Sequence, residues 1–207
     1  MTMNNSEIVA DFFDKTCANA KEGWQASMWL SEDDQYERFA VSIGILPNLS
    51  GEYSVLDVGC GTGDLYPFLK TRNKGISYTG VDISTVMIDK AKQKWPKANF
   101  VYNDFMSPNF PEINCQYDYV FGIGSFNLKV NEQDQYIEET LEKMWRLARR
   151  GMVVTMLSDN CDGPKHEQYY YYDASKILQW CLKKTKYLML NHASTHPEFV
   201  VFMYKDE

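Results

Sequence analysis

The sequence predicts an α/β protein: an open sheet, mostly parallel with an antiparallel last strand, in three αβα layers, plus a helical N-terminal cap. From Tyr53 onward, short apolar runs alternate with amphipathic helical patterns, which is typical of a parallel sheet covered by helices. The last two apolar runs, Lys186–Leu190 and Phe199–Tyr204, are separated by too few residues for a helical crossover. We therefore expect these two strands to pair antiparallel.

Seven short apolar runs are the candidate strands. The first of them is followed at once by glycines, so it is expected to end in a sharp turn. The predicted strands are Tyr53–Val58, Ile76–Val81, Asn99–Tyr102, Tyr117–Gly122, Met152–Leu157, Lys186–Leu190 and Phe199–Tyr204.

Helical periodicity and capping residues predict the helices between these strands. Ser84 is well placed as an N-cap, and the helix after it carries Met87, Ala91 and Trp95 on one face. The longest predicted helix covers Glu132 to Arg150 and is followed by Gly151 at the position of a C′ glycine. A further helix is predicted over Asp173 to Lys183.

The first fifty residues differ from the remainder because they show helical patterns and no strand-like run. Apolar residues such as Phe12, Phe13, Phe39 and Ile43 recur there at helical spacing, and the segment 47–51 breaks the chain before the first strand. The predicted organisation is a helical cap over residues 1–50 and an α/β domain over residues 51–207. A length of 207 residues suits one structural domain overall.

Composition excludes several classes of protein. The chain has 21 Lys+Arg against 28 Asp+Glu, a net charge of −7, which argues against a broad nucleic-acid surface. No apolar run reaches the roughly 18 residues of a membrane span, and the first residues do not resemble a secretory leader. The five cysteines are scattered without a C-x-x-C pair, so we expect neither a disulfide framework nor a metal site. A cytoplasmic protein is the expected setting.

The segment from Val55 to Asp64 carries the strongest functional signal. A buried strand runs into a turn with Gly59, Gly61 and Gly63, and a helix is expected to begin near Asp64. Glycines let the backbone turn sharply and let a ligand approach the main-chain N–H groups closely. This pattern predicts a ligand-binding loop at the carboxyl end of the first strand.

The acidic residues around this turn indicate the kind of ligand. Asp82 ends the second strand, about twenty residues beyond the glycines, where a carboxylate reaches ribose hydroxyls. A dinucleotide-binding turn has a glycine at the position of Asp64, and Asp57 lies just before the turn, where a pyrophosphate would be repelled. The residues therefore favour a nucleoside that is joined to a cationic group.

Two further loops follow the third and fourth strands. Asn103, Asp104 and Phe105 place an acceptor beside an aromatic ring, where an adenine amino group and ring are readily bound. Gly122 begins a second polar loop that ends in Ser125, Phe126 and Asn127. Ligands of open α/β sheets bind at the carboxyl ends of the strands, so all four loops are expected at one site.

With these residues the sequence resembles the class I S-adenosyl-L-methionine-dependent methyltransferases. LDVGCGTGDL resembles their glycine-rich first motif, and GVDIS-x-x-MI-x-x-AK their ribose motif, while YNDF and YDYVFGIGSFNL resemble the next two. The resemblance covers roughly Val55 to Leu157. It implies a Rossmann-like fold of seven strands with the last strand antiparallel, and S-adenosyl-L-methionine as the cofactor, with no metal.

The resemblance also implies roles for individual residues. Asp82 would hold the ribose, Ile83 and Met87 would flank the adenine, and Asp104 with Phe105 would contact its amino group and face. The N-terminal segment that contains Gly23, Trp24 and Arg38 is similar to one in a bacterial subgroup, in which Arg38 would meet the methionine carboxylate. The expected cofactor-binding set is Arg38, Asp57, Gly59, Cys60, Gly61, Asp82, Ile83, Met87, Asn103, Asp104, Phe105 and Gly122.

The methyl acceptor is expected to be a small molecule, because the chain is acidic and has no nucleic-acid-binding appendage. Ser125-Phe126-Asn127 is also not the Asn/Asp-Pro-Pro-aromatic motif of amino-directed nucleic-acid methyltransferases. A protein or tRNA methyltransferase and a non-catalytic cofactor-binding module are the alternatives. The catalytic group is not identified by the sequence: His166, His192 and His196 are each candidates for a general base or for ordinary surface histidines.

Overall fold

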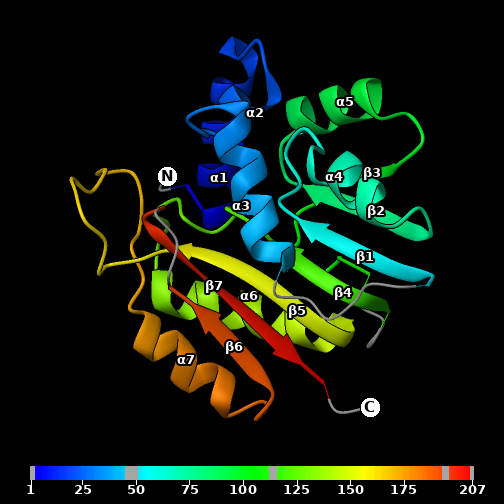
Figure 1. The fold of residues 1–207 in the computed structure, drawn as a ribbon. Helices are drawn as coiled ribbons and strands as arrows, with labels where there is room; N and C mark the ends of the chain where they lie inside the picture. Colours follow the sequence, from blue (N-terminus) through cyan, green and yellow to red (C-terminus); the bar gives the residue numbers. More distant parts are fainter. Residues whose placement is uncertain (1–2, 45–50, 112–115, 193–195, 206–207) are drawn as a thin grey trace.

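A computed structural model describes residues 3–44, 51–111, 116–192 and 196–205. Within this part, seven strands form one sheet in the order β3-β2-β1-β4-β5-β7-β6, and seven helices pack around it (Figure 1). The strands are β1 (Tyr53–Val58), β2 (Ile76–Asp82), β3 (Asn99–Tyr102), β4 (Tyr117–Gly122), β5 (Ala148–Leu157), β6 (Leu188–Asn191) and β7 (Glu198–Tyr204). The helices are α1 (Asn5–Asn19), α2 (Gly23–Ala26), α3 (Glu32–Gly44), α4 (Leu65–Arg72), α5 (Thr85–Lys94), α6 (Gln133–Leu147) and α7 (Ala174–Leu182).

The strand directions confirm the predicted sheet. β1 pairs in parallel with β2 and β4, β2 with β3, and β4 with β5. β7 runs antiparallel to both β5 and β6, as the short connection near the end of the chain predicts. The reversal of strand order at β1 and β4 places their carboxyl ends side by side, which is where open α/β sheets bind ligands.

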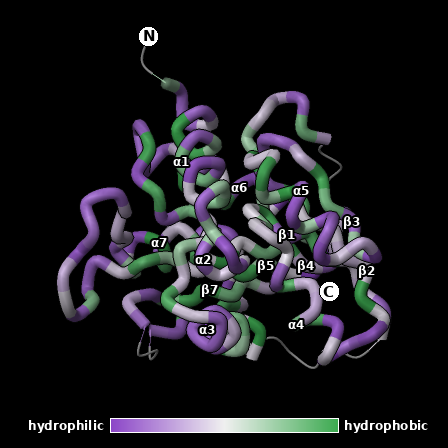
Figure 2. Tube along the Cα trace, turned by 90° about the horizontal axis from the view of Figure 1, so that it is seen from above, coloured by the Kyte–Doolittle hydropathy of each residue, from purple (hydrophilic) through white to green (hydrophobic). Residues whose placement is uncertain are grey.

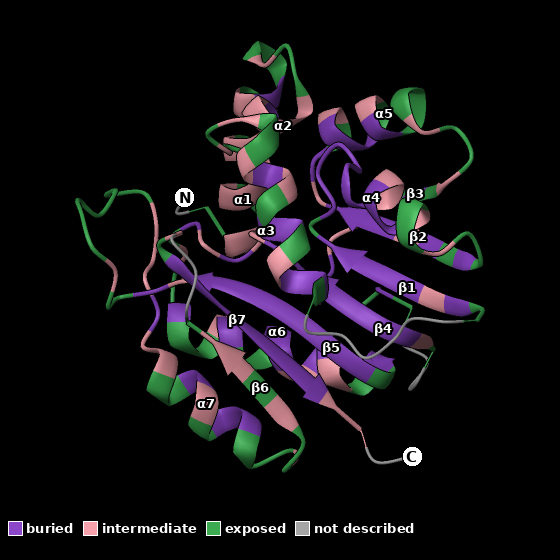
Figure 3. Cartoon of the chain, in the orientation of Figure 1, coloured by how far each residue is buried: buried purple, intermediate pink, exposed green. Residues whose placement is uncertain are grey.

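Helices cover both faces of the sheet and bury its side chains. Apolar residues of α3, α4 and α5 pack with one face, and those of α6 and α7 pack with the other. Along β5 the two faces alternate: Met152 and Val154 join the α6 side, and Val153 joins the α3 side, as the period of a strand requires. Figure 3 shows β1, β4, β5 and β7 buried along most of their length and the edge strand β6 more exposed, so the three-layer prediction is confirmed.

Hydropathy follows this layering. Seen from above in Figure 2, hydrophobic segments gather around β4, β5 and α6, whereas the loop between β5 and α7 is hydrophilic and stands away from the sheet. Among the described residues no helix has the length and the apolarity needed to cross a bilayer. The predicted break at 47–51 lies, except for Gly51, outside the described residues.

Local sequence patterns predict the start of α5 correctly and the end of α6 wrongly. The Ser84 hydroxyl caps α5 by accepting from the Met87 N–H at 3.1 Å, as predicted. The prediction of a helix through Arg150 is wrong, because α6 ends at Leu147 and β5 begins at Ala148. Arg149 bonds to Asp118 beside β4, and a Cβ on Gly151 would lie 2.5 Å from the Met203 carbonyl oxygen. Gly151 thus serves strand packing rather than a helix cap.

Candidate active site

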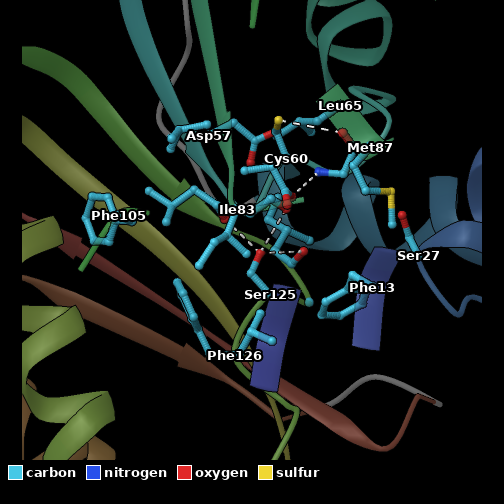
Figure 4. A pocket seen from close by; sticks show the side chains of 18 of the residues that line it. Phe13, Ser27, Asp57, Cys60, Leu65, Ile83, Met87, Phe105, Ser125 and Phe126 are labelled. Atoms are coloured by element: carbon cyan, nitrogen blue, oxygen red, sulfur yellow. Dashed lines mark hydrogen bonds between the residues drawn. The ribbon is translucent and has the colours of Figure 1, made fainter. Parts of the chain in front are cut away.

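A pocket opens where the carboxyl ends of β1, β2, β3 and β4 meet the N-terminal helices. It encloses about 990 Å³, counting the part that is open to solvent. Figure 4 shows Asp57, Cys60, Ile83, Phe105, Ser125 and Phe126 from the strand ends on one wall, with Phe13 and Ser27 of the N-terminal region opposite.

The glycine turn after β1 brings main-chain atoms to the pocket surface. Gly59 and Gly61 have φ angles of +71° and +53°, a region that residues with a Cβ rarely adopt. A Cβ on Gly59 would lie 2.6 Å from the Ser125 Cβ, and one on Gly61 would lie 2.9 Å from the Ser27 hydroxyl oxygen. The turn therefore needs glycine both for its conformation and for its closeness to the facing side chains.

Asp82 ties the end of β2 to this turn. Its Oδ2 accepts from the Gly61 N–H at 2.8 Å, and its Oδ1 accepts from the Ser84 N–H at 2.9 Å. Burial raises the pKa of Asp82, and the backbone N–H groups partly offset that shift. Each carboxylate oxygen retains a second lone pair, so the side chain can still accept from a ligand hydroxyl.

Asp57 lies deeper, just before the turn, and its partner is a phenol. The Tyr78 hydroxyl donates to Asp57 Oδ2 at 2.5 Å. Burial raises the pKa of Asp57 to about 7; the bond from Tyr78 lowers it, and the nearby Asp82 raises it further. Asp57 is therefore a carboxyl group that changes charge close to neutral pH.

Asp104 connects the loop after β3 to the first helix. Its Oδ2 accepts from the Ser6 hydroxyl at 2.6 Å, and its Oδ1 accepts from the Met106 N–H at 2.8 Å. Ser6 belongs to α1, so this bond spans 98 residues of sequence. The N-terminal helix thereby contacts a predicted site residue directly.

Two more contacts hold α1 over the pocket. The Ser84 hydroxyl donates to Asp14 Oδ1 at 2.5 Å, and the Lys90 ammonium donates to the carbonyls of Cys17 and Ala20 at 2.7 and 3.0 Å. A cation at the carboxyl end of a helix also interacts favourably with the helix dipole. These bonds fasten α1 to α5 beside the pocket.

Most of the predicted residues come together. Ten of the twelve line the pocket: Asp57, Gly59, Cys60, Gly61, Asp82, Ile83, Met87, Asn103, Asp104 and Phe105. The other two, Arg38 and Gly122, are not among its lining residues. Gly122 lies behind Phe126, because a Cβ there would be 2.4 Å from the Phe126 ring.

Arg38 has a different environment from the one expected for a carboxylate-binding residue. Its guanidinium donates to Glu198 Oε2 at 2.7 Å and to Asp34 Oδ1 at 3.3 Å, and it lies 4.8 Å from the centroid of the Trp29 ring. The side chain is only 7% exposed. Arg38 therefore supports Trp29, a lining residue, from within a buried ion-pair cluster.

The structure also brings in residues that were not predicted as site residues. They include Ser6, Val9 and Phe13 of α1, Trp29, and Tyr136 of α6. The spacing of Phe12 and Phe13 indicates an amphipathic helix but not which surface it covers. None of the three histidines lines the pocket; His192 bonds to the Ser158 hydroxyl at 2.7 Å, and His196 lies 3.2 Å from Asp34.

The lining residues fit a nucleoside cofactor with a cationic centre. The glycine turn lines the pocket with Gly59 and Gly61, and Asp82 offers carboxylate oxygens at the pocket surface. Apolar side chains of Ile83, Met87 and Phe105 stand beside them, as a flat base requires. No group of three or more His, Cys, Asp or Glu that could hold a metal occurs within the described ranges.

Comparisons with known proteins relate this chain to methyltransferases. Residues 55–151 match a family model described as a methyltransferase domain. A Mycobacterium tuberculosis protein that is provisionally named a methyltransferase is 29% identical over 165 residues, which cover 76% of this chain and 96% of that protein. The trans-aconitate 2-methyltransferase of Paracidovorax citrulli is 32% identical over 143 residues, 69% of this chain and 53% of the relative. The chain thus aligns with about half the length of the trans-aconitate enzymes.

Solved structures share the fold. The magnesium protoporphyrin IX methyltransferase of Synechocystis PCC 6803, crystallised with S-adenosylhomocysteine (SAH), superposes with a TM-score of 0.68 at 16% identity over 96% of this chain and 99% of that one. Phosphoethanolamine N-methyltransferase 1 of Haemonchus contortus gives a TM-score of 0.68 at 13% identity, over 98% of this chain and 50% of that one. At such identities the likeness concerns the fold alone. The fold, the pocket at its strand ends and the matching family model lead to one conclusion: residues 55–151 form a methyltransferase domain, in a chain with the fold of S-adenosyl-L-methionine-dependent methyltransferases.

Proposed function

We propose that this methyltransferase holds S-adenosyl-L-methionine in the pocket at the carboxyl ends of β1–β4 and transfers its methyl group to a small-molecule acceptor. The observation that carries the location is the 2.8 Å bond from the Gly61 N–H to Asp82 Oδ2. It joins the glycine turn and the acidic residue at one surface of the pocket, the two features that the cofactor requires.

Individual residues have distinct parts in this proposal. Asp82 accepts hydrogen bonds from the ribose hydroxyls, and Gly59 and Gly61 leave room for the methionine portion. Ile83 and Met87 lie against the adenine ring, and Asp104 with Phe105 contacts its amino group and face. Asp57 and Cys60 complete the wall behind the turn, and Asn103 extends it toward Asp104. Arg38 and Gly122 instead have supporting positions, Arg38 behind Trp29 and Gly122 behind Phe126.

When bound, the cofactor supplies an activated methyl group, whose bond to sulfur breaks with the electron pair remaining on sulfur. The protein's contribution is then largely alignment of the acceptor and exclusion of water. Phe13 and Trp29 on the N-terminal side and Phe126 after β4 enclose that region. Their apolar surfaces favour a partly dehydrated site, in which an acceptor atom is held close to the methyl carbon.

The enclosure of the pocket supports a small acceptor. α1 contributes Ser6, Val9 and Phe13 to the lining, and the contacts of Lys90 and Ser84 fasten this helix to α5. We assign residues 1–50 as the cap and residues 51–207 as the methyltransferase domain within one structural unit. The trans-aconitate enzymes among its relatives are named for a small metabolite. A cytoplasmic setting, with its supply of the cofactor, suits this activity.

Isothermal titration of SAH into the protein tests the cofactor assignment. We expect one site per chain, and a Kd at least tenfold weaker for Asp82→Ala, because hydrogen bonds to a charged group contribute roughly 1.5–3 kcal/mol. Asp89→Ala, on the exposed side of α5, is the matched control and is expected to bind like the wild type. Circular dichroism checks that each variant is folded. Absence of binding by the folded wild-type protein would contradict the proposal.

A further inference from the structure

The charged side chains that line the pocket are all acidic. Four carboxyl groups line it, those of Asp57, Asp64, Asp82 and Asp104, and no Lys, Arg or His does so. Residues 1–2, 45–50, 112–115, 193–195 and 206–207, which lie outside the described part, include no basic residue. Every Lys, Arg and His side chain is therefore placed by the structure, and each lies outside this lining.

Only one of these carboxylates is paired with a cation. Asp64 accepts from the Lys94 ammonium at 2.6 Å. The hydrogen-bond partners of the other three are neutral: the Tyr78 hydroxyl for Asp57, backbone N–H groups for Asp82, and the Ser6 hydroxyl with a backbone N–H for Asp104. Burial raises the pKa of both Asp57 and Asp82, which shows that negative charge is already costly at this site.

The guanidinium that supports the pocket wall is not available to an anionic ligand. Arg38 stands against Trp29 and is bound by Glu198 and Asp34, whose side chains are 2% and 10% exposed. His196, a further cation when protonated, lies beside the same Asp34 at 3.2 Å. Recruiting Arg38 to a substrate carboxylate would leave Glu198 buried without its charge partner, which is strongly unfavourable.

The rest of the lining is aromatic and neutral. Phe13, Trp29, Phe105, Phe126 and Tyr136 come from five separate segments of the chain and reach the same pocket. Figure 4 shows the rings of Phe105, Phe126 and Phe13 around its centre, with Ser125 between them. Such a surface binds apolar bodies, and aromatic faces also attract cations.

The cofactor itself suits this electrostatic environment. It carries one carboxylate, one ammonium and one sulfonium, and therefore a net positive charge. A ligand with two or three carboxylates would instead add negative charge to a pocket that already holds four carboxyl groups, with no Lys, Arg or His in its lining to offset it. The chain's own charges thus discriminate between acceptors by sign.

We propose that the methyl acceptor carries no carboxylate or phosphate, and that it is a neutral or cationic molecule with an apolar, ring-sized body. This inference rests on the proposed function and separates the chain from relatives named for trans-aconitate, a tricarboxylate. For an amine acceptor, the uncharged nitrogen forms the new N–C bond as the methyl–sulfur bond breaks, with the electron pair remaining on sulfur. The resulting ammonium then releases its extra proton to water.

Binding of three matched probes to the SAH-saturated wild-type protein tests the inference. The probes are 2-phenylethylamine, 2-phenylethanol and 3-phenylpropionate, measured by calorimetry at low salt, with trans-aconitate as a fourth ligand. We expect the amine and the alcohol to bind at least tenfold more tightly than the carboxylate, and trans-aconitate neither to bind nor, in a separate assay with S-adenosyl-L-methionine in place of SAH, to be methylated. The proposal is overturned by equal or tighter binding of phenylpropionate, by binding or methylation of trans-aconitate, or by failure of the amine and the alcohol to bind at millimolar concentration.

A pair of variants shows whether charge is the cause. Phe13→Lys places an ammonium in the lining of the acceptor region, and Phe13→Met is its uncharged control of similar reach. We expect Phe13→Lys to shift the ratio of phenylpropionate to phenylethylamine affinity by tenfold or more toward the carboxylate, and Phe13→Met to leave that ratio unchanged. An identical ratio in both variants would overturn the electrostatic explanation. SAH titration of the wild-type protein separates the two proposals, because loss of the acceptor inference leaves that binding intact.

Discussion

Gly59 illustrates how a single residue links backbone conformation to the site. Its φ of +71° and its closeness to Ser125 make two separate demands that only glycine meets. The sequence predicts the first demand, because a glycine trio after a buried strand indicates a sharp turn. The second depends on Ser125, sixty-six residues later, and needs the three-dimensional structure. Cys60 and Asp57, its neighbours, complete the same turn as predicted lining residues.

Replacing Gly59 by alanine should therefore affect stability and binding together. Strain in the left-handed region costs about 1–3 kcal/mol, and the new Cβ must also displace Ser125. Urea titration of Gly59→Ala should show this loss in the free energy of unfolding, and calorimetry should show weaker SAH binding. Gly44→Ala is the control, since a Cβ at the end of α3 meets nothing within 4 Å. That variant should change stability by less than about 1 kcal/mol; an equal loss in both variants would contradict this account of Gly59.

Asp57 gives the site a dependence on pH. Its pKa rises from an ordinary 3.8 to about 7 on folding, so the folded state retains a proton that the unfolded chain has released between these values. Stability from this group is complete below pH 4 and is lost as the pH rises toward 7, at no more than about 1.4 kcal/mol per pH unit. Urea titrations at pH 5 and pH 7.5 should show a larger loss in wild type than in Asp57→Asn. Parallel losses in the two proteins would refute the assignment.

At the scale of elements, α3 and β7 are joined by a buried ion pair that sequence patterns do not predict. Arg38 and Glu198 are 160 residues apart, and their 2.7 Å contact depends on β7 lying antiparallel beside β5 below α3. The end of α6 was also predicted wrongly, because the helical pattern in the sequence continues through Arg149 and Arg150. These two side chains bind Asp118 at the edge of β4, and this tertiary contact draws the chain into β5. The remaining strand positions followed from local patterns within a few residues.

Removing Glu198 should be among the most damaging changes outside the pocket. Glu198→Ala leaves Arg38 buried with a weaker partner, and the loss of one member of a buried pair typically costs about 3–5 kcal/mol. Chemical denaturation should show this decrease. Asp11→Ala, which breaks the exposed Lys15–Asp11 pair, is the matched control and should cost less than about 1 kcal/mol. A loss below about 1 kcal/mol for Glu198→Ala would show that the buried pair does not link these elements.

For the whole molecule, the parallel topology explains why so much of the pocket was predictable. Once β1 to β4 are recognised as neighbouring parallel strands, their carboxyl ends must meet, and the loops carrying Asp82, Asp104 and Ser125 converge. The contribution of α1 and of Trp29 was not predictable, because helical periodicity shows an apolar face but not its partner. The acidic balance of the sequence has a local counterpart, since the lining contains carboxylates and no cation.

The account's central claim is that the methyl donor occupies the pocket formed by the glycine turn, Asp82 and the N-terminal helices. The most direct measurement is a crystal structure of the protein with SAH. The account predicts ligand density in this pocket, with the ribose hydroxyls within hydrogen-bond distance of Asp82 and the adenine beside Met87. Density for SAH at another place on the molecule, with this pocket vacant, would contradict it.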